Sequence, residues 1–129
     1  MATDRQTMDR IAERVRAALD SADLASYGEL LDPDVYWGPP GDDRSGCHNR
    51  AQVLAWYERG REAGGRATVT EMVAGEDRLL VGLRVTGTAG AGGGATDRWQ
   101  VLRVRDGLVV DIRGFDRRED AVAHAGLAG

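Results

Sequence analysis

The spacing of apolar residues changes once along the chain, near residue 65. Of all the features of the sequence, this change most restricts the folds that the chain can adopt. Before it, residues 4–22 and 50–63 repeat apolar side chains every three or four positions, which indicates amphipathic helices. A shorter helix begins near Ser21 or Asp23 and ends at Pro33. After the change, four segments are strand-like, namely 66–74, 78–87, 96–104 and 108–115. This order predicts an α+β fold in which three N-terminal helices pack on one face of an antiparallel sheet.

Capping and turn signals mark the element boundaries. A capping-box pattern opens the first helix at Thr3 and the third helix at Asn49. Val35–Trp37 is apolar and lies between turn residues, which predicts a short strand. Asp116 has the side chain of a helix N-cap and predicts a last short helix over 117–125.

The last two strands form a hairpin whose register assigns side chains to faces. Arg105–Gly107 predicts a three-residue turn with the glycine in the left-handed conformation. That turn pairs Leu102 with Val110 and Gln100 with Ile112. We expect this more apolar face to meet the helices, so Gln100 becomes its conspicuous polar group.

The opposite face of this hairpin is also partly apolar. It carries Trp99 and Phe115 beside Arg113. Apolar side chains on an outer sheet face indicate a covering partner. We therefore predict a homodimer that forms through this face, with Trp99 and Arg113 in the contact.

Composition excludes several functions. All 17 basic residues are arginine, against 21 acidic ones, and the formal net charge is −4. A chain without lysine cannot form a lysine Schiff base. Its acidic balance argues against nucleic acid as a partner, because nucleic acid needs a basic face.

The remaining residue counts limit cofactors and location. Cys47 is the only cysteine, and His48 and His124 lie far apart, so we expect no disulfide, no metal site and no cofactor. The glycine-rich segment 90–95 precedes a strand, which favours a hairpin connection over a dinucleotide-binding loop.

The sequence contains no apolar run near the ~20 residues that span a membrane and no apolar leader, so we expect a cytoplasmic protein without a membrane partner.

Three segments carry a resemblance to a known superfamily. They are Val15–Leu24, Arg44–Gly46 with Ala51–Tyr57, and Val104–Val109. They resemble the nuclear transport factor 2-like superfamily, which includes SnoaL-like cyclases and ketosteroid isomerases. The resemblance implies one domain over 1–129, shaped as a cone-like barrel with a strongly curved antiparallel sheet. It also implies a pocket between sheet and helices, and dimers through the outer sheet face.

The resemblance does not extend to the superfamily's catalytic residues. A ketosteroid isomerase uses a tyrosine, a base aspartate and a second aspartate that holds the oxyanion. These positions align with Val15, Trp37 and Gln100, of which only Gln100 can donate a hydrogen bond. Epoxide hydrolase relatives use an Asp-Arg-Asp arrangement, for which Asp97 and Arg98 supply part. The histidine of the cyclase relatives is missing.

Two functions therefore stay open: an acid–base isomerase, hydrolase or cyclase acting on an apolar small molecule, or a non-catalytic ligand-binding or accessory subunit. His48 is a candidate base because the ordinary pKa of histidine lies near neutrality. Cys47 is a candidate nucleophile because it precedes a helix, whose N-terminal dipole would lower the thiol pKa. The polar candidates for a site are His48, Asp97, Arg98 and Gln100. The expected pocket lining is Val15, Trp37, Trp56, Leu102, Val110 and Ile112.

Overall fold

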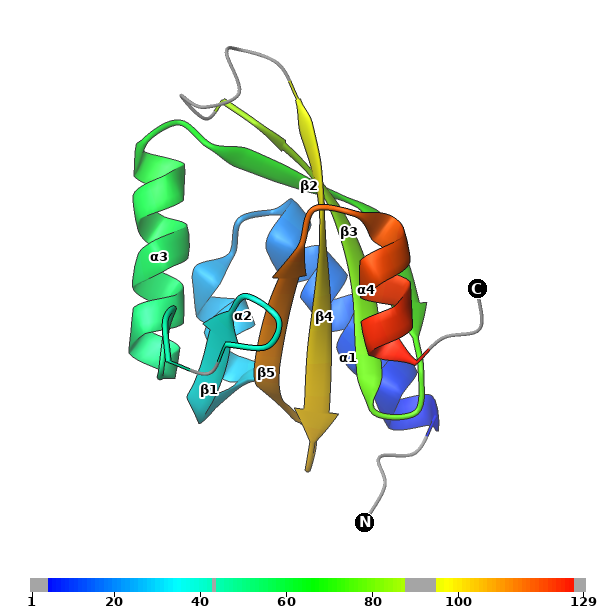
Figure 1. Ribbon diagram of the computed structural model, residues 1–129. Helices are drawn as coiled ribbons and strands as arrows, with labels where there is room; N and C mark the ends of the chain where they lie inside the picture. The colour runs from blue at the N-terminus through cyan, green and yellow to red at the C-terminus, as the bar shows by residue number, and fades with distance from the viewer. Residues whose placement is uncertain (1–4, 43, 88–94, 127–129) are drawn as a thin grey trace.

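The computed structural model describes residues 5–42, 44–87 and 95–126, so Thr3 and most of the segment 90–95 lie outside it. The chain forms two helices, a strand and a third helix, and then four strands and a last helix (Figure 1). The elements are α1 (Arg5–Asp20), α2 (Leu24–Glu29), β1 (Leu31–Gly38), α3 (Arg50–Glu62), β2 (Arg66–Ala74), β3 (Arg78–Thr86), β4 (Thr96–Arg105), β5 (Leu108–Phe115) and α4 (Arg118–Ala125).

Side-chain caps explain where two of the helices begin. The Asp23 carboxylate accepts a backbone N–H from the first turn of α2 at 3.1 Å. The Asn49 side chain does the same for α3 at 2.9 Å, so both predicted caps are confirmed. The predicted cap at Asp116 is wrong. α4 begins without a side-chain cap, and the Asp116 carboxylate instead pairs with Arg98 at 3.2 Å.

The sheet is mixed, with strand order β1-β5-β4-β3-β2. β2 to β5 form the predicted antiparallel meander. The expectation of an entirely antiparallel sheet is wrong, because β1 pairs with β5 in parallel. This strand begins at Leu31, earlier than Val35–Trp37 indicated, and it contains Pro33. An edge strand tolerates proline because one of its sides needs no hydrogen bonds.

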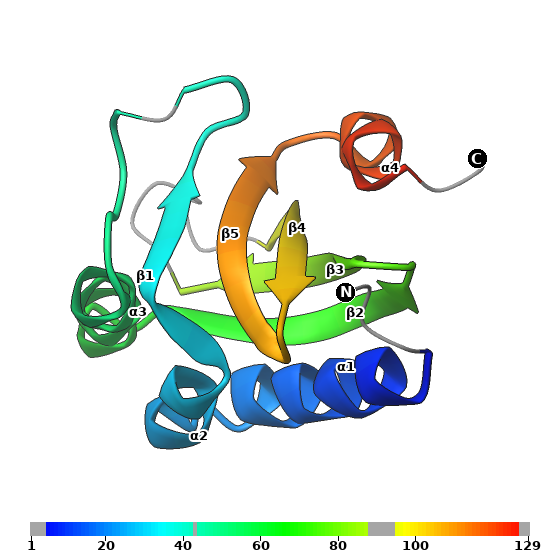
Figure 2. The same cartoon turned by 90° about the horizontal axis from the view of Figure 1, so that it is seen from below.

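The sheet is twisted but not strongly curled, which corrects the expected cone-shaped barrel (Figures 1 and 2). Its edge strands β1 and β2 do not pair with each other, so the sheet stays open. Figure 2 shows α1 and α2 below the sheet, α4 on its other side, and α3 beside β1. Because helices pack on both faces, the sheet does not curl around the helices of one face.

The β4–β5 hairpin has a different register from the predicted one. Both Asp106 and Gly107 have positive φ angles, 54° and 82°, as a two-residue type I′ turn requires. A bulge follows and leaves Val110 as the extra residue on β5. Leu102 therefore pairs with Ile112, and Gln100 with Gly114. Without the bulge, a two-residue turn would place apolar and polar side chains of the hairpin on the same face. The bulge shifts the rest of β5 by one residue and so keeps the apolar side chains together on one face.

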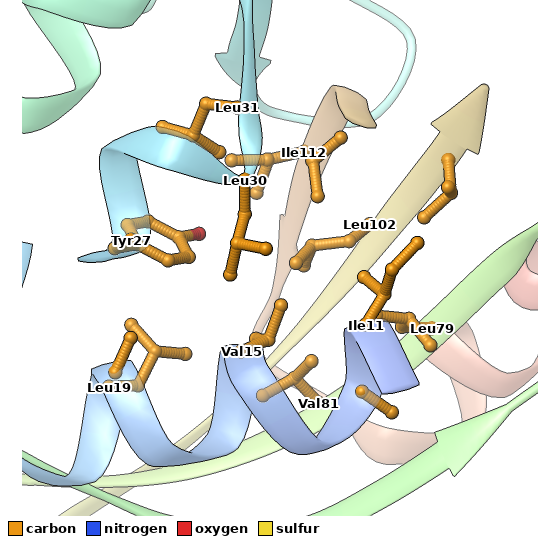
Figure 3. Close-up of a cluster of buried hydrophobic side chains, with 14 of the residues drawn as sticks. Ile11, Val15, Leu19, Tyr27, Leu30, Leu31, Leu79, Val81, Leu102 and Ile112 are labelled. Atoms are coloured by element: carbon orange, nitrogen blue, oxygen red, sulfur yellow. The ribbon is translucent and has the colours of Figure 1, made fainter. Parts of the chain in front are cut away.

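The main core lies between α1, α2 and one face of the sheet (Figure 3). The stripe on α1 supplies Ile11, Val15 and Leu19, as its three- and four-residue spacing predicts. Leu102 and Ile112 meet them from the sheet, both fully buried. The removal of such apolar side chains from water is the main contribution that favours folding.

α4 covers the outer face of the sheet. Val101 and Phe115 pack with the apolar side of α4 in a second cluster, and Trp99 is partly buried against it. The Arg113 side chain is only 12% exposed and pairs with Asp111 at 3.0 Å. The chain's own helix thus accounts for the apolar character from which the homodimer was predicted, and the dimer stays a prediction.

Candidate functional site

A cleft of about 810 Å³ lies between α3, the end of α1 and the strands β2 to β4. We call it the aromatic cleft. Its wall is aromatic, its floor carries a buried amide, and arginines surround its margin. Besides small and aliphatic residues, the lining comprises Trp37, Trp56, Tyr57, Trp99, Gln100, Asp20, Arg59, Arg61, Arg66 and Arg98. This volume suits a small organic ligand.

Three rings from β1 and α3 build the wall. Trp37 and Tyr57 are stacked, with centroids 4.9 Å apart and planes 16° from parallel. Trp56 meets Trp37 edge to face at 6.1 Å. Trp56 is 54% exposed and is the one large apolar side chain in the described residues that is exposed. A flat wall that reaches solvent in this way favours contact with a ring-bearing molecule.

The floor is a buried polar group on β4. Gln100 is 6% exposed, and its Nε2 donates to the Tyr57 hydroxyl at 3.3 Å. Its Oε1 is buried and has no partner among the described residues, and the same holds for the Tyr27 hydroxyl. Burial raises the pKa of Tyr57, although the hydrogen bond from Gln100 lowers it in part. The phenol therefore stays protonated near neutral pH.

Four arginines stand around the margin of the aromatic cleft. Arg61 pairs with Glu58 at 3.0 Å, and Arg98 pairs with Asp116 at 3.2 Å. Arg66 donates only to backbone carbonyls in the described part of the chain. Arg59 lies over the Trp56 ring, 5.7 Å from its centroid.

Asp20 is the acidic residue that lines this cleft. Its Oδ1 accepts the backbone N–H of Val69 at 2.7 Å, which ties the end of α1 to β2. Its Oδ2 lies 3.9 Å from the Arg16 guanidinium. Both oxygens thus face the protein's own donors, and the carboxylate has a structural role at the margin.

The polar candidates from the sequence separate into two pairs. Arg98 and Gln100 line the aromatic cleft. His48 is exposed on the loop before α3, where its Nε2 lies 2.6 Å from the backbone oxygen of Arg44. Asp97 is also exposed and lies 3.2 Å from Arg84 on the neighbouring strand. Neither His48 nor Asp97 is among the residues that line the cleft.

The expected apolar lining also separates. Trp37 and Trp56 line the aromatic cleft. Val15, Leu102 and Ile112 are fully buried in the main core, where α1 and α2 pack on the sheet, and so do not line the cleft. The bulge on β5 leaves Val110 half-buried outside that core.

A second hollow of about 770 Å³ adjoins the aromatic cleft and shares Trp37, Trp56, Arg59 and Arg98 with it. Cys47 lines this hollow and is held by backbone hydrogen bonds to Trp37. The sequence suggested that the following helix lowers the thiol pKa. Burial raises the pKa of Cys47 instead, although Arg59 opposes the shift. The thiol is therefore protonated near neutral pH and is a weak nucleophile.

Sequence reasoning missed Tyr57, Arg59 and Arg66 as cleft residues. Tyr57 lies four positions after the buried Val53 on α3, and this spacing could have placed it on the inner face. Arg59 and Arg66 carry no such signal. Exposed arginines are frequent in this chain, and only the packing of α3 against the sheet shows which of them surround a cleft.

Residues 12–112 match the family profile of the SnoaL-like domain. The chain belongs to this family. No curated protein matches it. Within the described ranges, no helix is long and apolar enough to cross a membrane, and no three His, Cys, Asp or Glu side chains are grouped to hold a metal ion.

Solved structures show the same nuclear transport factor 2-like fold. A candidate ketosteroid isomerase from Kribbella flavida is 23% identical, with a TM-score of 0.72 over 88% of this chain and 79% of the other. A candidate polyketide cyclase from Xanthomonas campestris is 17% identical, with a TM-score of 0.70 over 95% and 99%. A hypothetical protein from Catenulispora acidiphila, in complex with trimethylamine, is 19% identical, with a TM-score of 0.64 over 92% and 93%. At these identities the likeness concerns the fold.

Proposed function

We propose that this SnoaL-like protein binds a small, ring-bearing organic molecule in the aromatic cleft. One observation carries the proposal. Gln100 lines the cleft that Trp37 and Tyr57 wall, and its Oε1 is buried without a hydrogen-bond partner in the described residues. An unpaired buried acceptor costs roughly 1–3 kcal/mol. A ligand that donates a hydrogen bond to it would recover this cost while its rings contact the aromatic wall.

The comparisons support a small-molecule ligand in general terms. Relatives of this fold carry the names of enzymes that act on small molecules, and one relative was solved with trimethylamine. Because this fold supports many different functions, the function must be inferred from the residues that line the cleft of this chain.

The residues around the cleft favour binding over acid–base catalysis. Among the described residues, its interior holds an amide, one tyrosine and tryptophans, and its margin holds arginines. Amides do not titrate, and arginine and a buried tyrosine stay protonated near neutral pH. Asp20 is occupied by the Val69 N–H. His48 and Asp97 point to other partners, so we assign them no contact with the ligand.

Binding can be tested by titration calorimetry with a panel of bicyclic aromatic compounds. Trp56→Ala removes an exposed wall residue and leaves the core intact. We expect it to weaken binding about tenfold, since interface tryptophans contribute more than 1 kcal/mol. His48→Ala is the matched control outside the cleft and should bind as the unmodified protein does. Binding lost in His48→Ala but retained in Trp56→Ala would overturn the proposal.

A further inference from the structure

We propose that the ligand is an organic anion, namely a ring acid whose carboxylate is bound by Arg59 and Arg66 and whose far end donates a hydrogen bond to Gln100. This inference rests on the proposed function, because it concerns the same cleft. It adds the charge of the ligand and the direction in which the ligand enters.

The charge around the aromatic cleft differs in sign from that of the whole chain. The whole chain is acidic, with a formal net charge of −4. The described residues that line the cleft carry the opposite balance, with four arginines against Asp20 alone. An arrangement of this sign attracts anions and repels cations, most strongly in a partly desolvated cleft.

Two of these arginines have no neighbouring carboxylate that balances their charge. Glu58 neutralises Arg61, and Asp116 neutralises Arg98. Within the described residues, Arg59 and Arg66 have no carboxylate partner: Arg59 contacts the Trp56 ring, and Arg66 donates to carbonyl oxygens. A guanidinium presents planar paired donors that match a carboxylate. A ligand carboxylate is therefore the partner that these two side chains lack.

Charged, aromatic and amide groups line the cleft between its margin and its floor. Arg59 lies 5.7 Å from the centroid of the Trp56 ring, so the charged margin directly borders the aromatic wall. Gln100, at the floor, has an unpartnered acceptor in its Oε1, while one of its two N–H groups donates to the Tyr57 hydroxyl. A matching ligand carries a carboxylate at one end, rings in the middle and a hydroxyl or N–H group at the other end.

The probe for the test is hydroxynaphthoic acid with its two substituents on opposite rings. Its neutral carboxamide removes the charge, and naphthoic acid removes the hydroxyl. We expect calorimetry to show that the acid binds about tenfold more tightly than the carboxamide, as one charge-assisted hydrogen bond would provide. Added salt should weaken binding of the acid and leave that of the carboxamide unchanged.

Variants locate the two ends of the probe. Arg59→Gln and Arg66→Gln should each weaken the acid about tenfold and weaken the carboxamide less, because the carboxamide carries no charge. Arg103→Gln is the matched control, because Arg103 is exposed and does not line the cleft. Gln100→Met should remove the preference for hydroxynaphthoic acid over naphthoic acid.

The outcomes separate this inference from the proposed function. If the acid and its carboxamide bind equally, and Trp56→Ala weakens both, the cleft binds ring compounds and the anion inference is wrong. If Arg103→Gln weakens the acid as much as Arg59→Gln does, general surface charge explains the preference, and the inference is again wrong. If none of the naphthalene probes binds the unmodified protein, the proposed function itself is contradicted.

Discussion

Arg113 anchors the loop after β1, and its removal should destabilise the protein more than removal of any exposed arginine. Its guanidinium donates to the Asp111 carboxylate at 3.0 Å and to the backbone oxygens of Pro39 and Asp42 at 2.9 and 3.0 Å. It also lies 4.6 Å from the centroid of the Tyr36 ring. One side chain on β5 thus holds a loop more than 70 residues away in sequence.

The magnitude follows from burial. The Arg113 and Asp111 side chains are 12% and 16% exposed, so Arg113→Met leaves Asp111 as a nearly buried, unpaired charge. Breaking a buried pair in this way costs about 3–5 kcal/mol, and because both side chains keep some exposure we expect a loss of about 3 kcal/mol. For a domain of this length, that corresponds to a fall of about 10 °C in Tm.

The matched control is the Arg84–Asp97 pair, in which the side chains are 57% and 50% exposed. Exposed pairs contribute less than about 1 kcal/mol, so Arg84→Met should change stability little. Urea unfolding followed by circular dichroism measures both variants.

The double variant Arg113→Met/Asp111→Leu tests the cause. It removes the orphaned charge and should be more stable than Arg113→Met alone. Equal losses in Arg113→Met and Arg84→Met, or a double variant less stable than Arg113→Met, would refute the reasoning.

Three other predictions concern local features of the fold and are tested by urea unfolding. The Arg118 guanidinium lowers the pKa of Glu71 below its usual 4.5, so the pair stabilises the fold above that pH. Glu71→Gln should therefore lose at most about 1 kcal/mol of unfolding free energy near neutral pH. The difference in stability between this variant and the unmodified protein should vanish as the pH falls below 4.5. A constant difference across pH would contradict this. Gly46 has a φ angle of 94°, and a Cβ there would overlap backbone atoms. Gly41 has a φ angle of 78° and open space around it. Gly46→Ala should therefore lower the free energy of unfolding by more than the ~1 kcal/mol that we expect for Gly41→Ala. Asn49→Ala should lose about 1 kcal/mol because it removes the cap of α3, and an unchanged midpoint would show that the cap is dispensable.

The sequence by itself determined the elements and their order. Local interactions are sufficient for this: the apolar stripe of α1 repeats with the helical period, and Asp23 and Asn49 cap helices within their own first turn. The family could also be recognised, because the resemblance extends along nearly the whole chain. The register of the last hairpin was not accessible, because the bulge at Val110 repacks residues that a turn rule alone assigns to the wrong face.

Only the tertiary structure decided the candidate site. Arg59, Arg66 and Arg98 lie on α3, β2 and β4, and nothing in the local sequence distinguishes them from the other arginines. Likewise, the chemistry of His48 makes it a reasonable base, yet its loop turns the imidazole to a backbone oxygen outside the cleft. Side-chain type is a property of each residue. Which side chains share a cleft depends on strand pairing and helix packing between distant segments, and those contacts form only in the folded chain.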